Sequence, residues 1–238
     1  MQFIDRFDVI LLDMARTFMF DVDRFSATED FSATYRRLGG NALGSEKVQQ
    51  LISTVFNAMR TDSLNPYVYD RFPSVRHYLE TLPLPDALPG NELDLLEQVF
   101  AEHEVGTVPE AYAEVLHRLR KTHRLGVVSD LWSDKELSVA ELERADIRAL
   151  FEVCVFSSDH GHLKPSPYPF LQAIAAFTVE RARLLFVGDS LRRDIAGAKA
   201  VGLSTVWIKA EQNNPNVPNA QSPIPDLVVQ DLRHLLAP

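Results

Sequence analysis

Short apolar runs, most of them bounded by polar or glycine residues, recur along the chain. Runs of this length are typical of strands that are buried on both faces of a sheet. Segments with a helical spacing of apolar residues separate most of the runs, which indicates a parallel sheet covered by helices on both faces. The predicted strands are Val9–Leu12, 125–128, 153–156, 184–187, 205–208 and the weaker Leu227–Val229.

The helices predicted around these strands are 111–121, 134–142, 168–177 and 192–201. Ser133 precedes the second of them and has a side chain suited to an N-cap. Gly202 is placed to end the fourth, because glycine readily adopts the left-handed conformation that follows many helices. Residues 211–225, which are rich in asparagine and proline, are expected to form a surface loop.

The pattern changes between the first and second predicted strands. Residues 18–108 contain no convincing strand, and their helix-like stretches are 28–38, 45–61, 74–81 and 92–102. A segment of this length is too long for a loop. We interpret it as a helical cap domain inserted into an α/β core made of residues 1–17 and 109–238. The predicted fold class is therefore α/β, a three-layer Rossmann-like parallel sheet whose inserted α-helical cap overhangs the strand ends as a lid.

Composition excludes several classes of function. The 238 residues are 46% hydrophobic, which is ample for a core, and the net charge of −9 argues against a nucleic-acid partner. Cys154 is the single cysteine, so no internal disulfide can form. No apolar stretch reaches the length of a membrane span, and the N-terminus lacks the pattern of a signal peptide. We expect a cytoplasmic protein without a membrane partner, and the sequence does not indicate an oligomeric state.

Polar groups stand at or just after the ends of four predicted strands, where open α/β sheets bind ligands. Asp13 and Asp189 together offer the hard oxygen ligands that suit Mg²⁺. The Ser129 hydroxyl can donate to a phosphoryl oxygen, and Lys164 offers a positive charge that pairs with Asp13 and with the anion. Asp194 is placed to orient the metal's water or Lys164. Such a site would hold a phosphoryl group for attack by Asp13 and would form a covalent aspartyl intermediate.

The order of these motifs resembles the haloacid dehalogenase superfamily. The motifs are Asp-x-x-x-Thr after the first strand, a strand that ends in serine, Lys-Pro-x-Pro, and Gly-Asp-Ser-x-x-x-Asp. The resemblance covers the whole chain, and the helical insert looks like that superfamily's first type of cap. It implies that Asp13 is the nucleophile and a Mg²⁺ ligand. It further implies a metal-binding backbone carbonyl at Ala15, phosphoryl binding by Ser129 and Lys164, and metal ligation by Asp189 and Asp194.

Ala15 departs from this pattern. Phosphatases of the family usually have a second aspartate here, which protonates the leaving oxygen and then activates water. General acid–base help of this kind is typically worth about 10²–10⁴-fold in rate. The glycine that usually follows is replaced by Arg16, which either binds an anionic substrate in the cleft or points to solvent. Of the remaining charged groups, Asp21 and Asp23 are expected to be a solvated pair, and Arg192 and Arg193 a solvated basic pair.

Several functions fit these residues. The first is a phosphatase of small phosphorylated compounds with an impaired or altered acid–base step. The second is a phosphonatase-like enzyme, whose family relatives also have alanine at this position and use a cap lysine to form an imine with the substrate. Lys47 would be that lysine, although the polar sequence around it favours a surface position. The third is a catalytically inactive protein that binds a phosphorylated ligand or a partner, and a metal-independent dehalogenase is a weaker fourth.

Aromatic residues complete the predictions. Trp132 is expected to pack between helix and sheet rather than line the cleft. Most aromatic residues of the insert are expected to form its own core, since a domain of that size needs one. They are Phe25, Phe31, Tyr35, Phe56, Tyr67, Tyr69 and Phe72.

Overall fold

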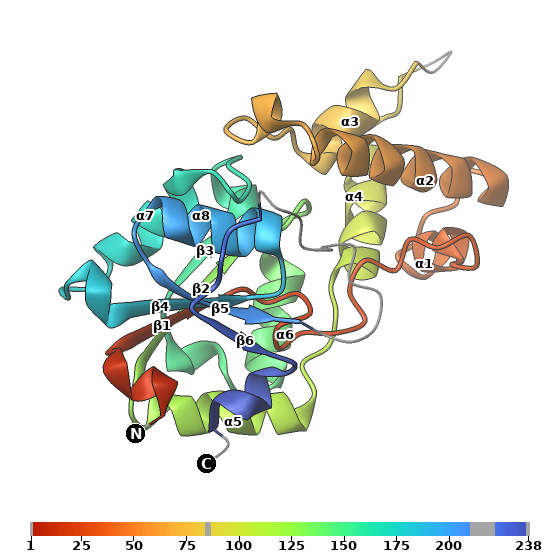
Figure 1. Cartoon of the computed structure of the whole chain (residues 1–238). Coiled ribbons are helices and arrows are strands. Elements are labelled where there is room, and N and C mark those ends of the chain that lie inside the picture. The colour runs from red at the N-terminus through yellow and green to blue at the C-terminus, as the bar shows by residue number, and fades with distance from the viewer. Residues whose placement is uncertain (1, 84–86, 210–221, 237–238) are drawn as a thin grey trace.

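The computed structural model describes residues 2–83, 87–209 and 222–236. Within them six parallel strands form one sheet in the order β3-β2-β1-β4-β5-β6, as Figure 1 shows. The α/β prediction is confirmed, and each predicted strand is present. Most of the expected loop 211–225 lies outside the described residues. The strands are β1 (Val9–Leu12), β2 (Arg124–Ser129), β3 (Phe151–Phe156), β4 (Leu184–Gly188), β5 (Ser204–Ile208) and β6 (Leu227–Val229).

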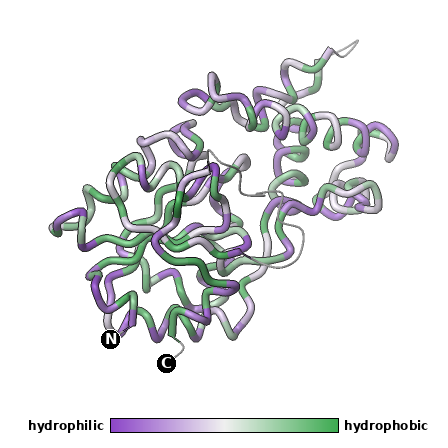
Figure 2. The backbone as a smooth tube through the Cα atoms, in the orientation of Figure 1, coloured by the Kyte–Doolittle hydropathy of each residue, from purple (hydrophilic) through white to green (hydrophobic). Residues whose placement is uncertain are grey.

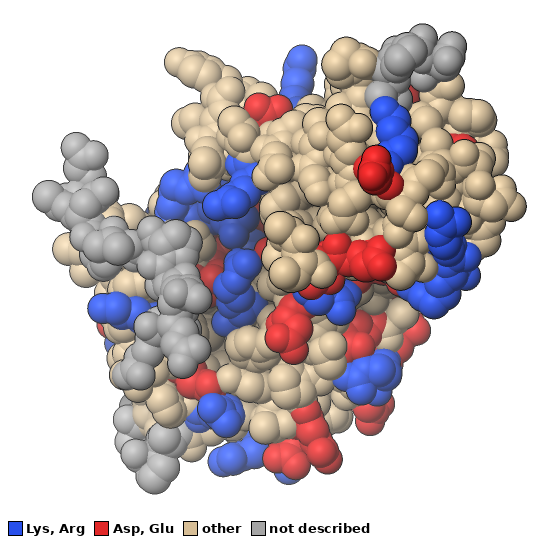
Figure 3. Space-filling model, turned by 90° about the vertical axis from the view of Figure 1, so that its right-hand side faces the viewer, with Lys and Arg blue, Asp and Glu red and all other residues tan. Residues whose placement is uncertain are grey.

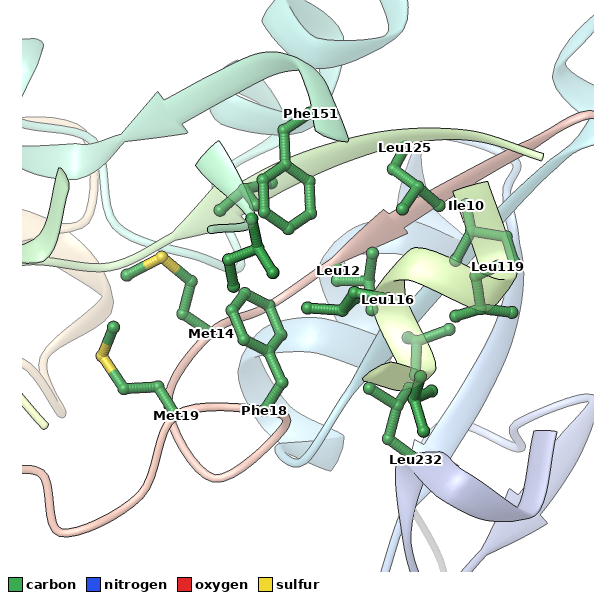
Figure 4. Close-up of a cluster of buried hydrophobic side chains, with 14 of the residues drawn as sticks. Ile10, Leu12, Met14, Phe18, Met19, Leu116, Leu119, Leu125, Phe151 and Leu232 are labelled. Atoms are coloured by element: carbon green, nitrogen blue, oxygen red, sulfur yellow. The ribbon is translucent and has the colours of Figure 1, made fainter. Parts of the chain in front are cut away.

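Helices cover both faces of the sheet because alternate strand residues point to opposite sides. Ile10 and Leu12 of β1 pack in the same apolar cluster as residues of the helices α5 and α6 (Figure 4). Val9 and Leu11 pack instead with residues of α7 and α8. Figure 2 shows the resulting concentration of hydrophobic residues along the central strands. These helices are α5 (Glu110–Arg120), α6 (Glu136–Arg144), α7 (Pro167–Ala175) and α8 (Ala196–Ala200).

The N-cap predicted at Ser133 is wrong. Helix α6 begins at Glu136, and its N-cap is Lys135. The backbone N–H of Ser133 instead donates to Glu104 Oε2 at 2.8 Å, and the Ser133 hydroxyl donates to the same oxygen. The loop after β2 is thereby tied to a residue of the inserted segment. By contrast, Gly202 lies at φ +82° just after α8, as its predicted role requires.

Four further helices lie between β1 and α5 in the chain and form a separate group beside the sheet in Figure 1. They pack around their own apolar cluster. Phe31, Tyr35 and Phe72 are buried there as predicted, but Tyr67 is 96% exposed, so its assignment to this cluster is wrong. No helix in the described part of the chain is long and apolar enough to cross a membrane. The four helices are α1 (Phe31–Arg37), α2 (Ser45–Asp62), α3 (Val75–Thr81) and α4 (Gly90–Glu104).

Trp132 joins the helical group to the sheet. Its ring lies 5.8 Å from the rings of both Phe56 and Phe72, measured between centroids, so the prediction that it packs between helix and sheet is wrong. A second contact lies nearby, where the N–H of Phe72 donates to the carbonyl of Gly161 at 2.7 Å. The helical group is therefore held against the loops that follow β2 and β3.

Candidate active site

Asp13 directly follows the central strand. Leu12 pairs with Val127 of β2 on one side and with Val187 of β4 on the other, so Asp13 emerges between the ends of two neighbouring strands. Its N–H still donates to the carbonyl of Val187 at 2.9 Å, which fixes the backbone. The residue is only 4% exposed. Burial raises the pKa of the Asp13 carboxyl, while the neighbouring Lys164 acts in the opposite direction.

Lys164 provides the buried positive charge of the site. Its Nζ lies 2.6 Å from Asp13 Oδ1, 2.7 Å from Asp194 Oδ1 and 3.1 Å from the carbonyl oxygen of Val128. Burial alone would lower the pKa of this ammonium, but Asp13, Asp194 and Asp130 outweigh it and raise the pKa above its usual value. Lys164 therefore stays charged, with hydrogen bonds to Asp13 and Val128 and an ion contact to Asp194.

The carboxylates that the sequence predicts as metal ligands lie close together. One oxygen each of Asp13, Asp189 and Asp194 lies within 4.8 Å of the others. Burial, helped by the charges of Asp194 and Asp13, raises the pKa of Asp189 to about 7. Gly188 makes the close packing possible, because a Cβ atom there would lie 2.5 Å from Asp194 Oδ2. A bound cation would relieve the repulsion among the three carboxylates.

A cavity of about 60 Å³ opens beside Asp13, and it also has Ala15, Ser129 and Lys164 in its walls. The Ser129 side chain is buried, and its hydroxyl has no hydrogen-bond partner among the described residues. A buried hydroxyl without a partner is costly, so its position favours an incoming acceptor. Lys47, in the first turn of α2, is not among the described residues that line this cavity.

The sequence left open whether Arg16 lies in the cleft or points to solvent, and the structure shows its position. Arg16 lines the cavity, with its side chain half exposed, and its guanidinium lies 2.9 Å from the carboxylate of Asp23. Asp23 lines the cavity too, and it is exposed to solvent, as is Asp21. Arg16 and Asp23 have positive φ angles, +55° and +56°, in the connector that leaves β1. The connector therefore brings an ion pair, rather than a lone cation, to the cavity.

The sequence prediction missed Arg193 and Asp130. Arg193 was expected in solvent, which is wrong: it lines the cavity, and its Nη1 lies 3.6 Å from Asp130 Oδ2. A single π-helical turn over Leu191–Ile195 directs it there, and such turns are frequent at functional sites. The available signals were the arginine immediately before Asp194 and the acid immediately after Ser129.

Glu104, at the end of α4, is a third missed residue of the cavity wall. Its carboxylate accepts from the backbone N–H of Trp132 at 2.7 Å and of Ser133 at 2.8 Å. Burial raises the pKa of Glu104 to about 7 in spite of these hydrogen bonds. Figure 3 shows the charges of this region from outside, with basic side chains gathered in the hollow beside the helical group and acidic ones between them.

Known proteins match both the sequence and the structure. The model of the family "haloacid dehalogenase-like hydrolase" matches residues 91–208, a region that includes Ser129, Lys164, Asp189 and Asp194. The matched residues make up just under half of the chain, which is similar to haloacid dehalogenase-like hydrolases over this region. A glyceraldehyde 3-phosphate phosphatase of Pyrococcus abyssi is 41% identical over 139 residues, which are 56% of this chain and 57% of that protein. A phosphoserine phosphatase of Thermus thermophilus is 30% identical over 161 residues, or 67% of this chain and 62% of that protein.

Solved structures of haloacid dehalogenase-like proteins share the fold along nearly the whole chain. A phosphatase of this superfamily from Thermococcus onnurineus superposes with a TM-score of 0.62 at 22% identity, covering 96% of this chain and 95% of that one. A 2-haloacid dehalogenase from Pseudomonas syringae superposes with a TM-score of 0.64 at 23% identity, covering 96% of each chain. In sequence, the chain spans about half the length of the first curated relatives it matches.

Proposed function

We propose that this protein is a haloacid dehalogenase-like phosphohydrolase that cleaves a small phosphorylated compound through an aspartyl intermediate at Asp13. The observation that carries the proposal is the buried contact between Asp13 and Lys164, beside a cavity into which the free hydroxyl of Ser129 can donate. A carboxylate held next to a permanent cation at the end of the central strand suits nucleophilic attack. The sequence relatives that are phosphatases support the same reaction class.

The residues divide the reaction between them. A carboxylate oxygen of Asp13 attacks phosphorus, and the bond from phosphorus to the leaving oxygen breaks. Ser129 donates a hydrogen bond to a phosphoryl oxygen, while Lys164 keeps Asp13 ionised and oriented. Water then attacks phosphorus, which releases phosphate and restores the Asp13 carboxylate. Placing the charges in a buried site before the reaction begins is a large part of such catalysis.

Mg²⁺ fits the donor set. Asp13 and Asp189 supply carboxylate oxygens close enough to share one ion. The carbonyl of Ala15 lies two residues after Asp13 in the same segment of the chain. Asp194 sits behind them, where Lys164 and the N–H of Ser190 already contact its oxygens. When bound, Mg²⁺ would neutralise charge on the phosphoryl group. We therefore place Asp13, Ala15 and Asp189 around the metal, with Asp194 as the group that orients them.

We further propose that residues 18–108 act as a cap that encloses a small substrate. Trp132 and the 69–72 segment join this group to the core beside the cavity, and the cavity itself is small. The relatives act on short phosphorylated metabolites according to their names, glyceraldehyde 3-phosphate and phosphoserine among them. We therefore expect a substrate of similar size.

Ala15 is expected to slow this reaction, because it has no carboxyl group to move protons. Asp23 and Glu104 are the described carboxyl groups that the connector and α4 bring to the cavity wall. Glu104 is held by its hydrogen bonds to the loop after β2, which leaves Asp23 better able to exchange protons with solvent. The alternative of imine chemistry at Lys47 receives no support from the cavity lining.

The test is a screen for phosphate release from small phosphomonoesters with Mg²⁺, comparing the wild type with three variants. Asp13→Asn should abolish release. Asp21→Asn is the matched control, because Asp21 is exposed and its φ of +56° suits asparagine equally well. Ala15→Asp should raise release by about 10²-fold or more, because it restores the missing carboxyl group. Tight ligand binding without release by wild type or Ala15→Asp would favour the inactive binding protein instead.

A further inference from the structure

Arg193 lines the cavity from the segment that follows β4. Its side chain is 28% exposed and forms part of the cavity wall. Burial alone would lower the pKa of this guanidinium, but the charges of Asp130, Asp194, Asp189 and Asp13 raise it. A permanently charged, planar group with several N–H donors therefore stands beside the nucleophile.

Lys164 is already engaged by groups of the protein. Its Nζ donates to Asp13 Oδ1 and to the carbonyl of Val128, and it lies 2.7 Å from Asp194 Oδ1. Donating to a further oxygen would compete with these contacts of buried groups. A second cationic donor would let the anion bind without weakening them.

Asp130 holds Arg193 only loosely. The shortest distance between their charged atoms, 3.6 Å, is longer than a hydrogen bond, and Asp130 Oδ2 has no hydrogen-bond partner among the described residues. The other oxygen of Asp130 accepts from the backbone N–H of Lys164 at 3.0 Å, which anchors the carboxylate. Arg193 can thus turn toward a ligand while Asp130 stays in place.

We propose that Arg193 is a phosphoryl-binding residue of this site, which leaves Asp130 and donates to the oxygens of the phosphoryl group that Asp13 attacks. This inference rests on the proposed phosphoryl chemistry. It adds Arg193 to the groups of the cavity wall that bind the anion. In the resting protein Asp130 competes with the phosphoryl group for the same guanidinium.

Binding of inorganic phosphate, measured by calorimetry in the presence of Mg²⁺, tests this assignment without any need for turnover. Arg193→Gln should raise the dissociation constant about 10- to 100-fold, the usual loss for a hydrogen bond to a charged group. Arg193→Lys should raise it less, because the charge remains but the paired donors are lost. Arg192→Gln is the matched control in the same turn, where Arg192 is exposed and contacts Tyr69, and it should bind like the wild type.

Asp130→Asn separates binding from a structural role. It keeps an oxygen for the N–H of Lys164 but removes the charge that competes for Arg193, so phosphate should bind several-fold more tightly. Because removal of a negative charge favours an anion by itself, the gain should be much smaller when Arg193→Gln is also present, whereas a purely structural Arg193 would leave the gain unchanged. If Arg193→Gln does not fold, the double variant with Asp130→Asn avoids an unpaired buried carboxylate and serves for the same comparison.

The outcomes distinguish this inference from the proposed function. Equal phosphate affinity in wild type and Arg193→Gln overturns the role of Arg193, even if the enzyme releases phosphate from substrates. The absence of phosphate binding by the wild type also overturns it. Arg193-dependent phosphate binding in a protein that releases no phosphate from any ester would support this inference while overturning the proposed function.

Discussion

Glu104 should make the stability of this protein depend on pH in a way that one substitution removes. The residue is 8% exposed, and its carboxyl group accepts hydrogen bonds from the backbone of Trp132 and Ser133. Burial raises its pKa from 4.5 to about 7 in the folded protein. Glu104→Gln keeps the shape of the side chain but has no charge at any pH.

The size of the effect follows from linkage between protonation and folding. Because the pKa in the folded state lies above the unfolded value, the protonated carboxyl favours the folded state. That contribution is fully present below about pH 4.5 and is lost as the pH rises through about 7. A shift of this size corresponds to roughly 3 kcal/mol of unfolding free energy. The Gln side chain also places an amide N–H₂ against one backbone N–H, which costs about 1–3 kcal/mol independently of pH.

The assay is urea unfolding of wild type and Glu104→Gln at several pH values between about 4.5 and 8. We expect the difference in unfolding free energy between the two proteins to change by roughly 3 kcal/mol across this range, with the wild type losing stability relative to the variant as the pH rises. Glu102→Gln, in the same helix and ion-paired with Arg37, is the control and should follow the wild type. Parallel pH profiles for wild type and Glu104→Gln would refute the reasoning.

Three further results are expected. Gly188→Ala should lower the rate of phosphate release at least about tenfold, because the added Cβ would collide with the Asp194 carboxylate. An unchanged kcat in steady-state kinetics would contradict that close approach. Asp70→Asn should raise KM more than it changes kcat. The Asp70 carboxylate accepts from the Ser166 hydroxyl at 2.5 Å, and this contact helps to hold the proposed cap to the core. A change confined to kcat would argue against this role of Asp70. Removal of divalent ions with a chelator should abolish phosphate release, and Mg²⁺ should restore it, whereas full activity in chelator would exclude the metal role.

The strands could be predicted because their chemistry is local. Every residue of β1 is buried, so a continuous apolar run identifies it without knowledge of its partners. The grouping of Asp13, Lys164 and Asp189 could also be predicted, because the carboxyl ends of parallel strands meet at one edge of a sheet. The helices between β1 and α5 followed from the length of a segment without strand-like runs.

The missed features depend on contacts between distant parts of the chain. Serine is a common N-cap residue, but the hydroxyl and the N–H of Ser133 both donate to Glu104, and helix α6 begins three residues later. Trp132 stands in a loop whose partners, Phe56 and Phe72, come from the inserted segment. Arg193 was assigned to the solvent because a regular helix was assumed, whereas the π-helical turn brings it to the cavity.

The central claim is that Asp13 is the nucleophile and that Ala15 leaves the second half of the reaction slow. p-Nitrophenyl phosphate tests it directly, because its leaving group departs without an added proton, so the phosphorylated enzyme should accumulate. We predict a burst of about one p-nitrophenol per protein, followed by slow turnover. Mass spectrometry of the acid-quenched protein should find a phosphoryl group on Asp13, and Ala15→Asp should abolish the burst by speeding hydrolysis. A phosphoryl group on any other residue, or its complete absence from the wild type during turnover, would contradict the account.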